Sequence, residues 1–488
     1  MSAWSSVLGR LGFYRHHAKS RFAQALAQLG SAGLPRSGPE QWASYRLGLY
    51  DTVAKSKWDG RHVRGGVAVA ASLAACGRIG EAAAVARQLA AREHGARRGE
   101  LIDALAPFAP ELALELSADG TVTLALQVAL LLRTGRRDDA ATLLQGALAA
   151  GQAQDNPELH LLATNALGGE PSEQLARLNR FLTVHALPPL ALQDAARPPS
   201  PVNLVSAVSL PATRGPLVSV LMTAYNTADR IGAAIRGSLA QSYQDVEVIV
   251  VDDASTDSTG DVVRAIAEQD ARVKYVRLPS NAGTYVAKTV GLHHATGEFV
   301  TCHDSDDWSH PLRLEQQVEP LRQDKRLVAT TSQWVRMQDD GIYYARQLYP
   351  LMRLNPASPL FRRRLVMERA GLWDLVRTGA DSEFLARLRL VFGRRAVRQV
   401  RKPLAFGGHR PDSLMTAPAT GYSAAGVSPV RLAYWEAWTH WHIAELRAHR
   451  KPFMGPGFFA SRPFDVPDEI VVPRENVSRC MDAFGLPY

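Results

Sequence analysis

Short apolar runs alternate with amphipathic stretches from residue 217 onward, and this alternation constrains the fold of the 488-residue chain more than any other feature. The apolar runs lie at 218–222, 246–251, 274–278 and 299–302, and the amphipathic stretches between them lie at 230–241, 259–269 and 284–294. Strands that alternate with helices in this way predict a parallel, doubly wound α/β sheet. Ligands bind such a sheet at the carboxyl ends of its strands, so the residues that follow each run are the candidates for a functional site.

The first 200 residues follow a different pattern, with alanine and leucine at helical spacing and few β-branched runs. A helix, a glycine-containing turn and a second helix recur at Gly77, Gly135 and Gly168. The last two glycines are 33 residues apart, close to the period of helical-hairpin solenoids. These segments are similar to degenerate tetratricopeptide-type repeats. We therefore expect an all-α helical-repeat domain, which either packs as a scaffold or presents a partner-binding surface.

A proline-rich stretch separates the two patterns and marks the clearest domain boundary. Its prolines are Pro198, Pro199, Pro201, Pro211 and Pro216. Proline breaks helices and stiffens connecting segments, which predicts a linker here. The expected organisation is a helical domain at 1–196, the linker at 197–216, the α/β domain at 217–415 and a C-terminal extension at 416–488.

The C-terminal extension contains a row of tryptophans. Trp435, Trp438 and Trp441 follow one another at three-residue intervals, which places them on one face of a helix. Such a face can stack on sugar rings or pack into a core. Because large aromatic side chains at helical spacing are usually buried, we expect core packing.

The net charge of +9 is unevenly distributed and indicates an anionic ligand. Residues 361–410 contain twelve arginines and one lysine against four acidic residues, a cluster that favours phosphates or acidic glycans. Nucleic acid is not expected as a partner, because no nucleic-acid-binding module accompanies the charge. The three cysteines, Cys76, Cys302 and Cys480, are too few and too widely spaced for a disulfide scaffold, which favours a reducing cytoplasm.

The first thirty residues carry Arg10, Arg15, Lys19 and Arg21 and no acidic residue. The apolar residues interleaved with these bases are Trp4, Val7, Leu8, Leu11 and Phe22. This composition fits either a basic amphipathic helix on an anionic membrane surface or a packed leader helix. No stretch approaches the ~18 apolar residues of a membrane-spanning helix, and a signal-peptide core is missing. We expect a cytoplasmic protein, either free or peripheral on the inner face of the membrane.

Acidic residues cluster directly after two of the predicted strands. The segment 252–257 follows the run at 246–251, and the segment 303–308 follows the run at 299–302. Carboxylates at two neighbouring strand ends repel one another unless a cation lies between them, and oxygen ligands suit Mg²⁺ or Mn²⁺. Asp253 could instead cap a turn or a helix. Two such clusters in one sheet favour the cation site.

Several motifs, in order along the chain, resemble those of the family 2 glycosyltransferases of the GT-A fold. They are the opening strand at 218–226, the acidic segment at 250–257, the segments at 281–283 and 295–298, and the DxD segment at 304–306 with the stretch that follows it. The resemblance covers residues 217–415. It implies a Rossmann-like, doubly wound GT-A catalytic domain that uses a nucleotide-sugar donor.

By this resemblance, five residues have roles in binding the donor. Asp253 contacts the nucleotide base, with Thr223 and Tyr225 lining the same pocket. Asp304 faces the ribose and the diphosphate. Asp306 binds the metal, Mn²⁺ or Mg²⁺.

Three basic residues complete the donor site that the resemblance implies. Lys288 stands where the family often has arginine, so it neutralises a phosphate without the bidentate fork of arginine. In a closing segment at 407–414, His409 completes the metal shell or serves a structural role, and Arg410 holds phosphate.

Inverting sugar transfer also needs a base that takes the proton of the acceptor hydroxyl. The family supplies this base from an acidic motif at the start of a later helix, and residues 378–388 occupy that place. Alignment of the family's motif arginine with Arg387 puts the base on Asp381, where Ala380 replaces the glutamate that commonly precedes it. Asp381 can also cap the helix, and the two roles are compatible. Glu383 is the next candidate.

The resemblance therefore implies an inverting, metal-dependent glycosyltransferase that moves a sugar from a UDP-sugar to a hydroxyl acceptor in bacterial surface polysaccharide biosynthesis. The acceptor would be a glycan or a lipid-linked glycan. One alternative is a protein acceptor, such as flagellin, presented by the helical repeats. Another is a non-catalytic scaffold with a decayed transferase domain, against which the intact Asp253, Asp304, Asp306 and Asp381 argue.

Overall fold

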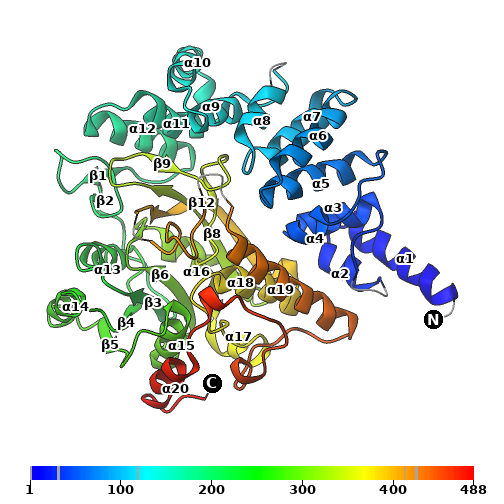
Figure 1. The fold of residues 1–488 in the computed structure, drawn as a ribbon. Coiled ribbons are helices and arrows are strands. Elements are labelled where there is room, and N and C mark those ends of the chain that lie inside the picture. The colour runs from blue at the N-terminus through cyan, green and yellow to red at the C-terminus, as the bar shows by residue number, and fades with distance from the viewer. Residues whose placement is uncertain (1–2, 30–32, 118–119, 412, 424–426, 488) are drawn as a thin grey trace.

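The computed structural model describes residues 3–29, 33–117, 120–411, 413–423 and 427–487. Helices occupy its N-terminal part, and Figure 1 shows them in a curved row beside the sheet. They are α1 (Ala3–Ala18), α2 (Phe22–Ala27), α3 (Gly38–Arg46), α4 (Tyr50–Ala54), α5 (Val63–Ala75), α6 (Ile79–Ala90), α7 (Gly95–Leu105), α8 (Pro110–Leu116), α9 (Leu124–Arg133), α10 (Arg137–Ala149), η1 (Gln152–Gln154), α11 (Glu158–Leu167) and α12 (Pro171–Val184). The all-α prediction for this region is confirmed.

Two of the predicted glycine turns share one local geometry. Gly77 and Gly135 have φ angles of +77° and +78°, in the left-handed region that favours glycine. The next residues, Arg78 and Arg136, begin α6 and α10 with nearly the same backbone angles, and each forms an ion pair with an acidic residue three positions later. The α5–α6 and α9–α10 pairs therefore repeat the same helix–turn–helix arrangement.

The N-terminal helix packs against its neighbour. Phe13 is buried, and the His17 ring lies 5.5 Å from the Phe22 ring of α2. Leu11 and Tyr14 are exposed on the opposite side. The apolar side chains expected at positions 4, 7 and 8 lie outside the described part of the chain.

The proline-rich stretch forms an ordered hairpin at the point where a linker was expected. Strands β1 (Leu190–Leu192) and β2 (Leu204–Ser206) pair antiparallel, with Leu190 opposite Ser206. The Asn203 amide donates to the carbonyls of Asp194, Arg197 and Pro198, which closes the loop between the two strands. Because Asn203 is buried, this segment packs against the rest of the molecule.

The first half of the large sheet agrees with the prediction. Its strands lie parallel in the order β5-β4-β3-β6, with helices in the three connections. The elements are β3 (Val218–Ala224), α13 (Ile231–Leu239), β4 (Val246–Asp252), α14 (Thr259–Ala267), β5 (Val273–Arg277), α15 (Thr284–His294) and β6 (Phe299–Asp304). Val220 and Met222 pack with α13 and α14 on one face, whereas Leu221 packs with α15 on the other. Helices therefore cover both faces, as a doubly wound sheet requires.

The second half of the sheet is mixed. The prediction of a parallel sheet covered strands only as far as residue 302 and did not extend to this half. Strand β11 lies antiparallel to both β6 and β8, and β12 lies parallel to β8. The reason is the connection from β8 to β11, which contains two short strands and no helix, so it does not form a parallel crossover. The elements are β7 (Trp308–Ser309), α16 (Arg313–Gln323), β8 (Ala329–Met337), β9 (Tyr343–Tyr344), β10 (Arg353–Leu354), β11 (Leu360–Arg362), α17 (Arg363–Arg369), α18 (Ala380–Phe392), η2 (Arg394–Ala396) and β12 (Val397–Gly408).

The C-terminal extension consists of α19 (Pro429–Arg447), η3 (Phe459–Ser461), η4 (Asp468–Ile470) and α20 (Arg474–Asp482). Trp438 and Trp441 are buried, which confirms the core prediction for them. Trp435 is 36% exposed, and its Nε1 donates to the Leu47 carbonyl in the helical region. Within the described ranges, none of the helices combines the length and the apolar character needed to cross a membrane.

The helical region shares its core with the sheet. Buried Glu158 of α11 accepts hydrogen bonds from the backbone N–H groups of Leu351 and Met352, beyond β9. One apolar cluster joins helical residues such as Leu161 to Phe406 of β12. The two parts therefore form one packed body.

Candidate active site

The carboxyl ends of β3, β4 and β6 bring the predicted donor-binding residues to one edge of the sheet. Thr223 of β3 is in register with Val251 of β4 and with Asp304 of β6. Asp253 follows β4 directly, so three segments far apart in sequence meet there. The Thr223 hydroxyl lies 2.7 Å from the Thr284 hydroxyl at the start of α15, and the Tyr225 ring is 47% exposed beside this edge.

Asp253 is held by the backbone that begins α15. Its two carboxylate oxygens accept hydrogen bonds from Ala282 N at 2.7 Å and Gly283 N at 2.8 Å. Gly283 has a φ of +84°, a conformation that glycine adopts without strain. Burial raises the pKa of Asp253 to about 6, although the two backbone hydrogen bonds act in the opposite direction.

Three carboxylates lie together after β6. Asp306 Oδ2 accepts a hydrogen bond from Arg410 Nε at 3.0 Å, and Asp307 Oδ1 accepts one from Gly408 N at 2.9 Å. Within the described ranges, the Asp304 side chain accepts none. Burial raises the pKa of both Asp304 and Asp307, and the charge of neighbouring carboxylates adds to the effect. The carboxylates of this segment therefore repel one another.

The donor set suits a hard divalent cation that is also bound by a substrate. No group of three His, Cys, Asp or Glu side chains able to hold a metal by itself occurs among the described residues. Mg²⁺ and Mn²⁺ are commonly held by one or two carboxylates with phosphate oxygens and water completing the shell. Asp304 and Asp306 fit this mode, and a cation there would relieve the repulsion between them.

His409 lies next to this cluster in a stacked arrangement. Its ring is parallel to the Tyr344 ring, with centroids 3.8 Å apart. Burial, together with the charge of Arg336, lowers the pKa of His409 to about 4, so the ring is neutral at pH 7. Its Nδ1 is buried without a hydrogen-bond partner. A neutral imidazole can bind a metal, and this role of His409 remains a prediction.

Asp381, the predicted base, lies in the first turn of α18 and faces α15. Lys288 Nζ contacts both of its carboxylate oxygens, at 3.0 and 3.1 Å, and the Tyr285 hydroxyl donates to Oδ2 at 3.1 Å. The Asp381 side chain remains 19% exposed, whereas Lys288 is buried. Burial alone would lower the pKa of Lys288. The charge of Asp381, together with those of Cys302, Asp304 and Tyr285, outweighs burial and holds that pKa well above its usual range.

The structure places the Lys288 ammonium group against Asp381. Its contact with donor phosphate, which the resemblance implies, remains a prediction. Tyr285 was not predicted as a site residue. The signal was present in its spacing, because residues three apart on a helix lie on the same face, and Tyr285 and Lys288 have this spacing on α15.

Glu383, two residues after Asp381, points into the protein interior. Its carboxylate forms an ion pair with Arg387 at 2.8 Å and contacts His442 Nε2 at 2.9 Å. Both Glu383 and Arg387 have no exposed surface. Of the two candidate bases, Asp381 is therefore the one whose carboxylate is accessible at the edge of the sheet.

Comparison with known proteins points to one family. The model described as glycosyl transferase family 2 matches residues 219–381. An uncharacterized glycosyltransferase of Haemophilus influenzae is 38% identical over 108 residues, which are 22% of this chain and 43% of that protein. The putative teichuronic acid biosynthesis glycosyltransferase TuaG of Bacillus subtilis is 40% identical over 104 residues, or 21% of this chain and 41% of that protein.

A third relative is named for its substrates. The UDP-Glc:alpha-D-GlcNAc-diphosphoundecaprenol beta-1,3-glucosyltransferase WfaP of Escherichia coli is 32% identical over 109 residues, or 22% of this chain and 43% of that protein. The match thus spans less than half the length of each of these three relatives.

Among solved structures, the mannosyltransferase PcManGT of Pyrobaculum calidifontis, in complex with GDP-Man and Mn²⁺, has a TM-score of 0.32 and 24% identity, covering 41% of this chain and 59% of that one. TarS 1–349 of S. aureus, in complex with UDP, has a TM-score of 0.33 and 20% identity, covering 40% of this chain and 61% of that one. The sequence matches and the topology of the described sheet lead to one conclusion: the chain contains a glycosyl transferase family 2 domain, matched over residues 219–381.

Proposed function

We propose that this chain is an inverting, metal-dependent glycosyltransferase that moves a sugar from a UDP-sugar to a hydroxyl acceptor in the assembly of a bacterial surface polysaccharide. One observation carries the proposal. Asp381 is a partly exposed carboxylate with a buried lysine as its counter-charge, and the electrostatic coupling of Asp304 to Asp381 places it beside the acidic cluster. A transferase domain that had lost its activity would not need both the Asp381–Lys288 pair and the acidic cluster beside it.

The donor is held at the strand ends. Asp253, Thr223 and Tyr225 receive the nucleotide base, and Asp304 receives the ribose and diphosphate. When bound, a divalent cation at Asp304 and Asp306 would neutralise charge on the diphosphate. Arg410 contacts Asp306, so its guanidinium group lies where it can also bind the negatively charged diphosphate.

The transfer is a single displacement. The acceptor oxygen forms a bond to the anomeric carbon as the bond from that carbon to the diphosphate oxygen breaks. The electron pair of the broken bond leaves with the nucleoside diphosphate, and the hydroxyl proton passes to Asp381. Lys288 and Tyr285 contact the Asp381 carboxylate and hold it in place, so it is positioned to accept that proton.

The acceptor and the setting follow from the relatives. Their names refer to teichuronic acid and to a lipid-linked diphosphate, which supports a glycan or lipid-linked glycan as acceptor. Such acceptors are assembled on the cytoplasmic side of a membrane, and the exposed side of α1 with its basic residues is a candidate contact for anionic lipid. In this proposal, residues 1–196 are the helical domain, 197–216 the proline-rich linker, 217–415 the catalytic domain and 416–488 the extension.

The test is to replace the base without disturbing the donor site. Asp381→Asn keeps the shape of the side chain but cannot take up the proton, so turnover should fall about 10²–10⁴-fold while UDP affinity is retained. Nucleotide sugars are first screened for metal-dependent hydrolysis by the full chain. The configuration of the product at the anomeric carbon is then determined by NMR.

Asp245→Asn is the matched control, because Asp245 forms a surface ion pair with Arg214 away from the site. It should leave turnover within about twofold of the wild type, since such surface pairs contribute little. A product that retains the donor's anomeric configuration contradicts single displacement. Full activity of Asp381→Asn would assign the base to another residue.

A further inference from the structure

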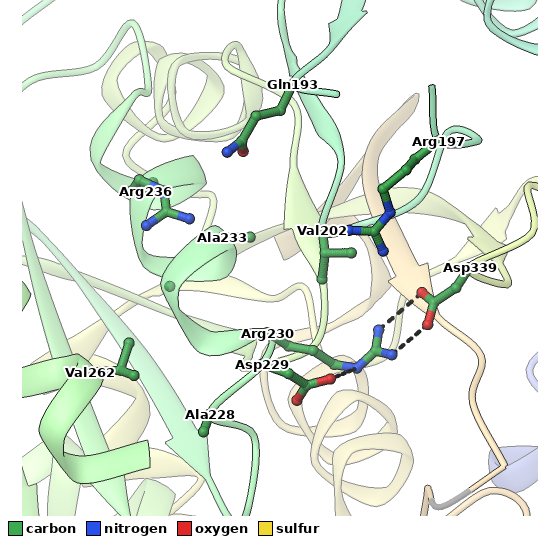
Figure 2. A pocket seen from close by; sticks show the side chains of 11 residues that line it. Gln193, Arg197, Val202, Ala228, Asp229, Arg230, Ala233, Arg236, Val262 and Asp339 are labelled. Carbon is green, nitrogen blue, oxygen red and sulfur yellow. Dashed lines mark hydrogen bonds and ion pairs between the residues drawn. The ribbon is translucent and has the colours of Figure 1, made fainter. Parts of the chain in front are cut away.

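A polar cavity of about 440 Å³ lies where the β1–β2 hairpin meets the start of α13. Its lining comes from the hairpin, from the start of α13 and the residues before it, from Val262 of α14 and from Asp339 just after β8, four separate segments of the chain. Figure 2 shows Arg197 and Arg236 on opposite sides of this cavity, with Gln193 at its rim. The volume is within the range of small-molecule binding sites.

The charges around the cavity are only partly balanced. Arg230 forms a bidentate pair with Asp339 and a further contact with Asp229 at 3.3 Å, so both of the lining aspartates are already paired with it (Figure 2). Arg197 and Arg236 are exposed, and neither has an ion-pair partner within the described ranges. Two guanidinium groups therefore face the cavity without an ion-pair contact, although the charge of Arg197 contributes to the lowered pKa of Asp339.

The wall of this cavity borders the acidic cluster of the candidate active site. The pKa of Arg230 is raised mainly by its hydrogen bond to Asp339, and the charge of Asp306 adds to the shift. The pKa of Asp339 is lowered mainly by Arg230, and the charge of Arg410 contributes. The Arg230–Asp339 pair thus lies close to the Asp306–Arg410 pair, and it also lines the cavity.

We propose that this cavity binds an anionic group, a phosphate or a carboxylate, carried by the acceptor saccharide. This inference rests on the proposed function and specifies its acceptor class. Two arginines without partners match the fork geometry of either oxyanion, and the Gln193 amide and the other polar groups suit a saccharide. A part of the acceptor held here would extend the contact between enzyme and acceptor past the sugar that reacts at Asp381.

The test measures binding of glucose 6-phosphate, glucuronate and neutral glucose to the full chain by ligand-observed NMR. Saturating UDP and Mg²⁺ are present, so that the donor site is filled. We expect at least one of the two anions to bind about tenfold more tightly than glucose, and its identity distinguishes a phosphate from a carboxylate. The double variant Arg197→Gln/Arg236→Gln should lose this preference, and added salt should weaken it.

Arg36→Gln/Arg61→Gln is the matched control, because it removes the same charge from exposed positions outside both the cavity and the arginine cluster at 361–410. It should bind the anions as the wild type does. Equal binding of glucose and both anions, or unchanged anion binding by the Arg197→Gln/Arg236→Gln variant, would overturn the inference. Hydrolysis of UDP-sugars by the wild type is measured in the same buffer: its absence refutes the proposed function, whereas hydrolysis without anion preference refutes only this inference.

Discussion

The two acidic loops at the edge of the sheet look alike in sequence, yet their carboxylates have different surroundings. In the loop at 252–257, each carboxylate has hydrogen-bond donors of its own. Asp252 accepts from Tyr275 and Arg277, and Asp253 from two backbone N–H groups. Asp257 accepts from Thr259 and Ala228.

In the loop at 304–307, donors are few. Asp306 and Asp307 accept one hydrogen bond each, and Asp304 accepts none within the described ranges. In the first loop the protein alone supplies every carboxylate with donors, whereas in the second Asp306 has Arg410 as its ion-pair partner and Asp304 has none within the described ranges. Acidic residues at a strand end therefore do not by themselves indicate a cation site, because it is the supply of donors that separates the two cases.

The largest expected effect concerns the second loop. Asp306→Ala should lower transfer at least about 10³-fold, because the cation and the diphosphate lose a carboxylate ligand. Asp257→Ala, in the loop at 252–257, should retain activity within a few-fold. Transfer is measured with and without EDTA, and Mn²⁺ binding by calorimetry. If the wild type kept its full transfer activity in EDTA, the loop at 304–307 would not need a cation. The proposed difference between the two loops would then be wrong.

The next effect tests the buried acid of α18. Glu383→Gln should lower the free energy of unfolding by about 3–5 kcal/mol, because it leaves Arg387 buried without its counter-charge. The pKa of Glu383 is lowered, chiefly because the charge of Arg387 outweighs burial. The stability it contributes is therefore present above the usual pKa of glutamate and is lost as the pH falls below it. Denaturant unfolding at pH 7 and pH 4 should show a smaller difference for the variant than for the wild type.

A third prediction concerns the charge beside Asp381. Lys288→Met should lower turnover about 10–100-fold, because Asp381 loses the ammonium group that contacts both of its carboxylate oxygens. Lys288→Arg should restore turnover in large part. If the lysine served only packing, the methionine variant would alter the melting temperature and leave turnover unchanged. The measurement is kcat/KM at pH 7, with thermal unfolding of the same variants beside it.

The smallest effect is expected in the loop at 252–257. Asp253→Asn should weaken UDP binding about tenfold, because the amide cannot accept from both backbone N–H groups. As the pKa of Asp253 lies at about 6, protonation of the wild type below that pH should weaken UDP binding in the same direction. Because this folded-state pKa is raised, Asp253 lowers stability as the pH rises from about 4 to about 6. Calorimetry from pH 5 to pH 8 should show a flatter profile for the variant.

Local pattern predicted the first half of the sheet and much of the site. Apolar runs of strand length, separated by amphipathic helices, predicted β3 to β6, and the acidic segments after two of them lie at one edge. The same reasoning did not extend to β8 to β12, because short strands in an irregular connection carry no periodic signal that indicates direction. The packed hairpin at 190–206 was not predicted either, because prolines indicate only where helices stop.

The sequence by itself determined the order of helices and strands in 218–304 and the two acidic loops, because each depends on spacing within one segment, and the family resemblance added Asp381 as a base candidate. Only the tertiary structure decided which side chains meet. Lys288 and Asp381 are 93 positions apart, and their pairing depends on how α15 packs near the start of α18. The charged cavity likewise requires the hairpin, α13, α14 and Asp339 after β8 together. Periodicity indicates which face of a helix or strand is buried. Packing between segments far apart in the chain determines which residue a buried charge pairs with.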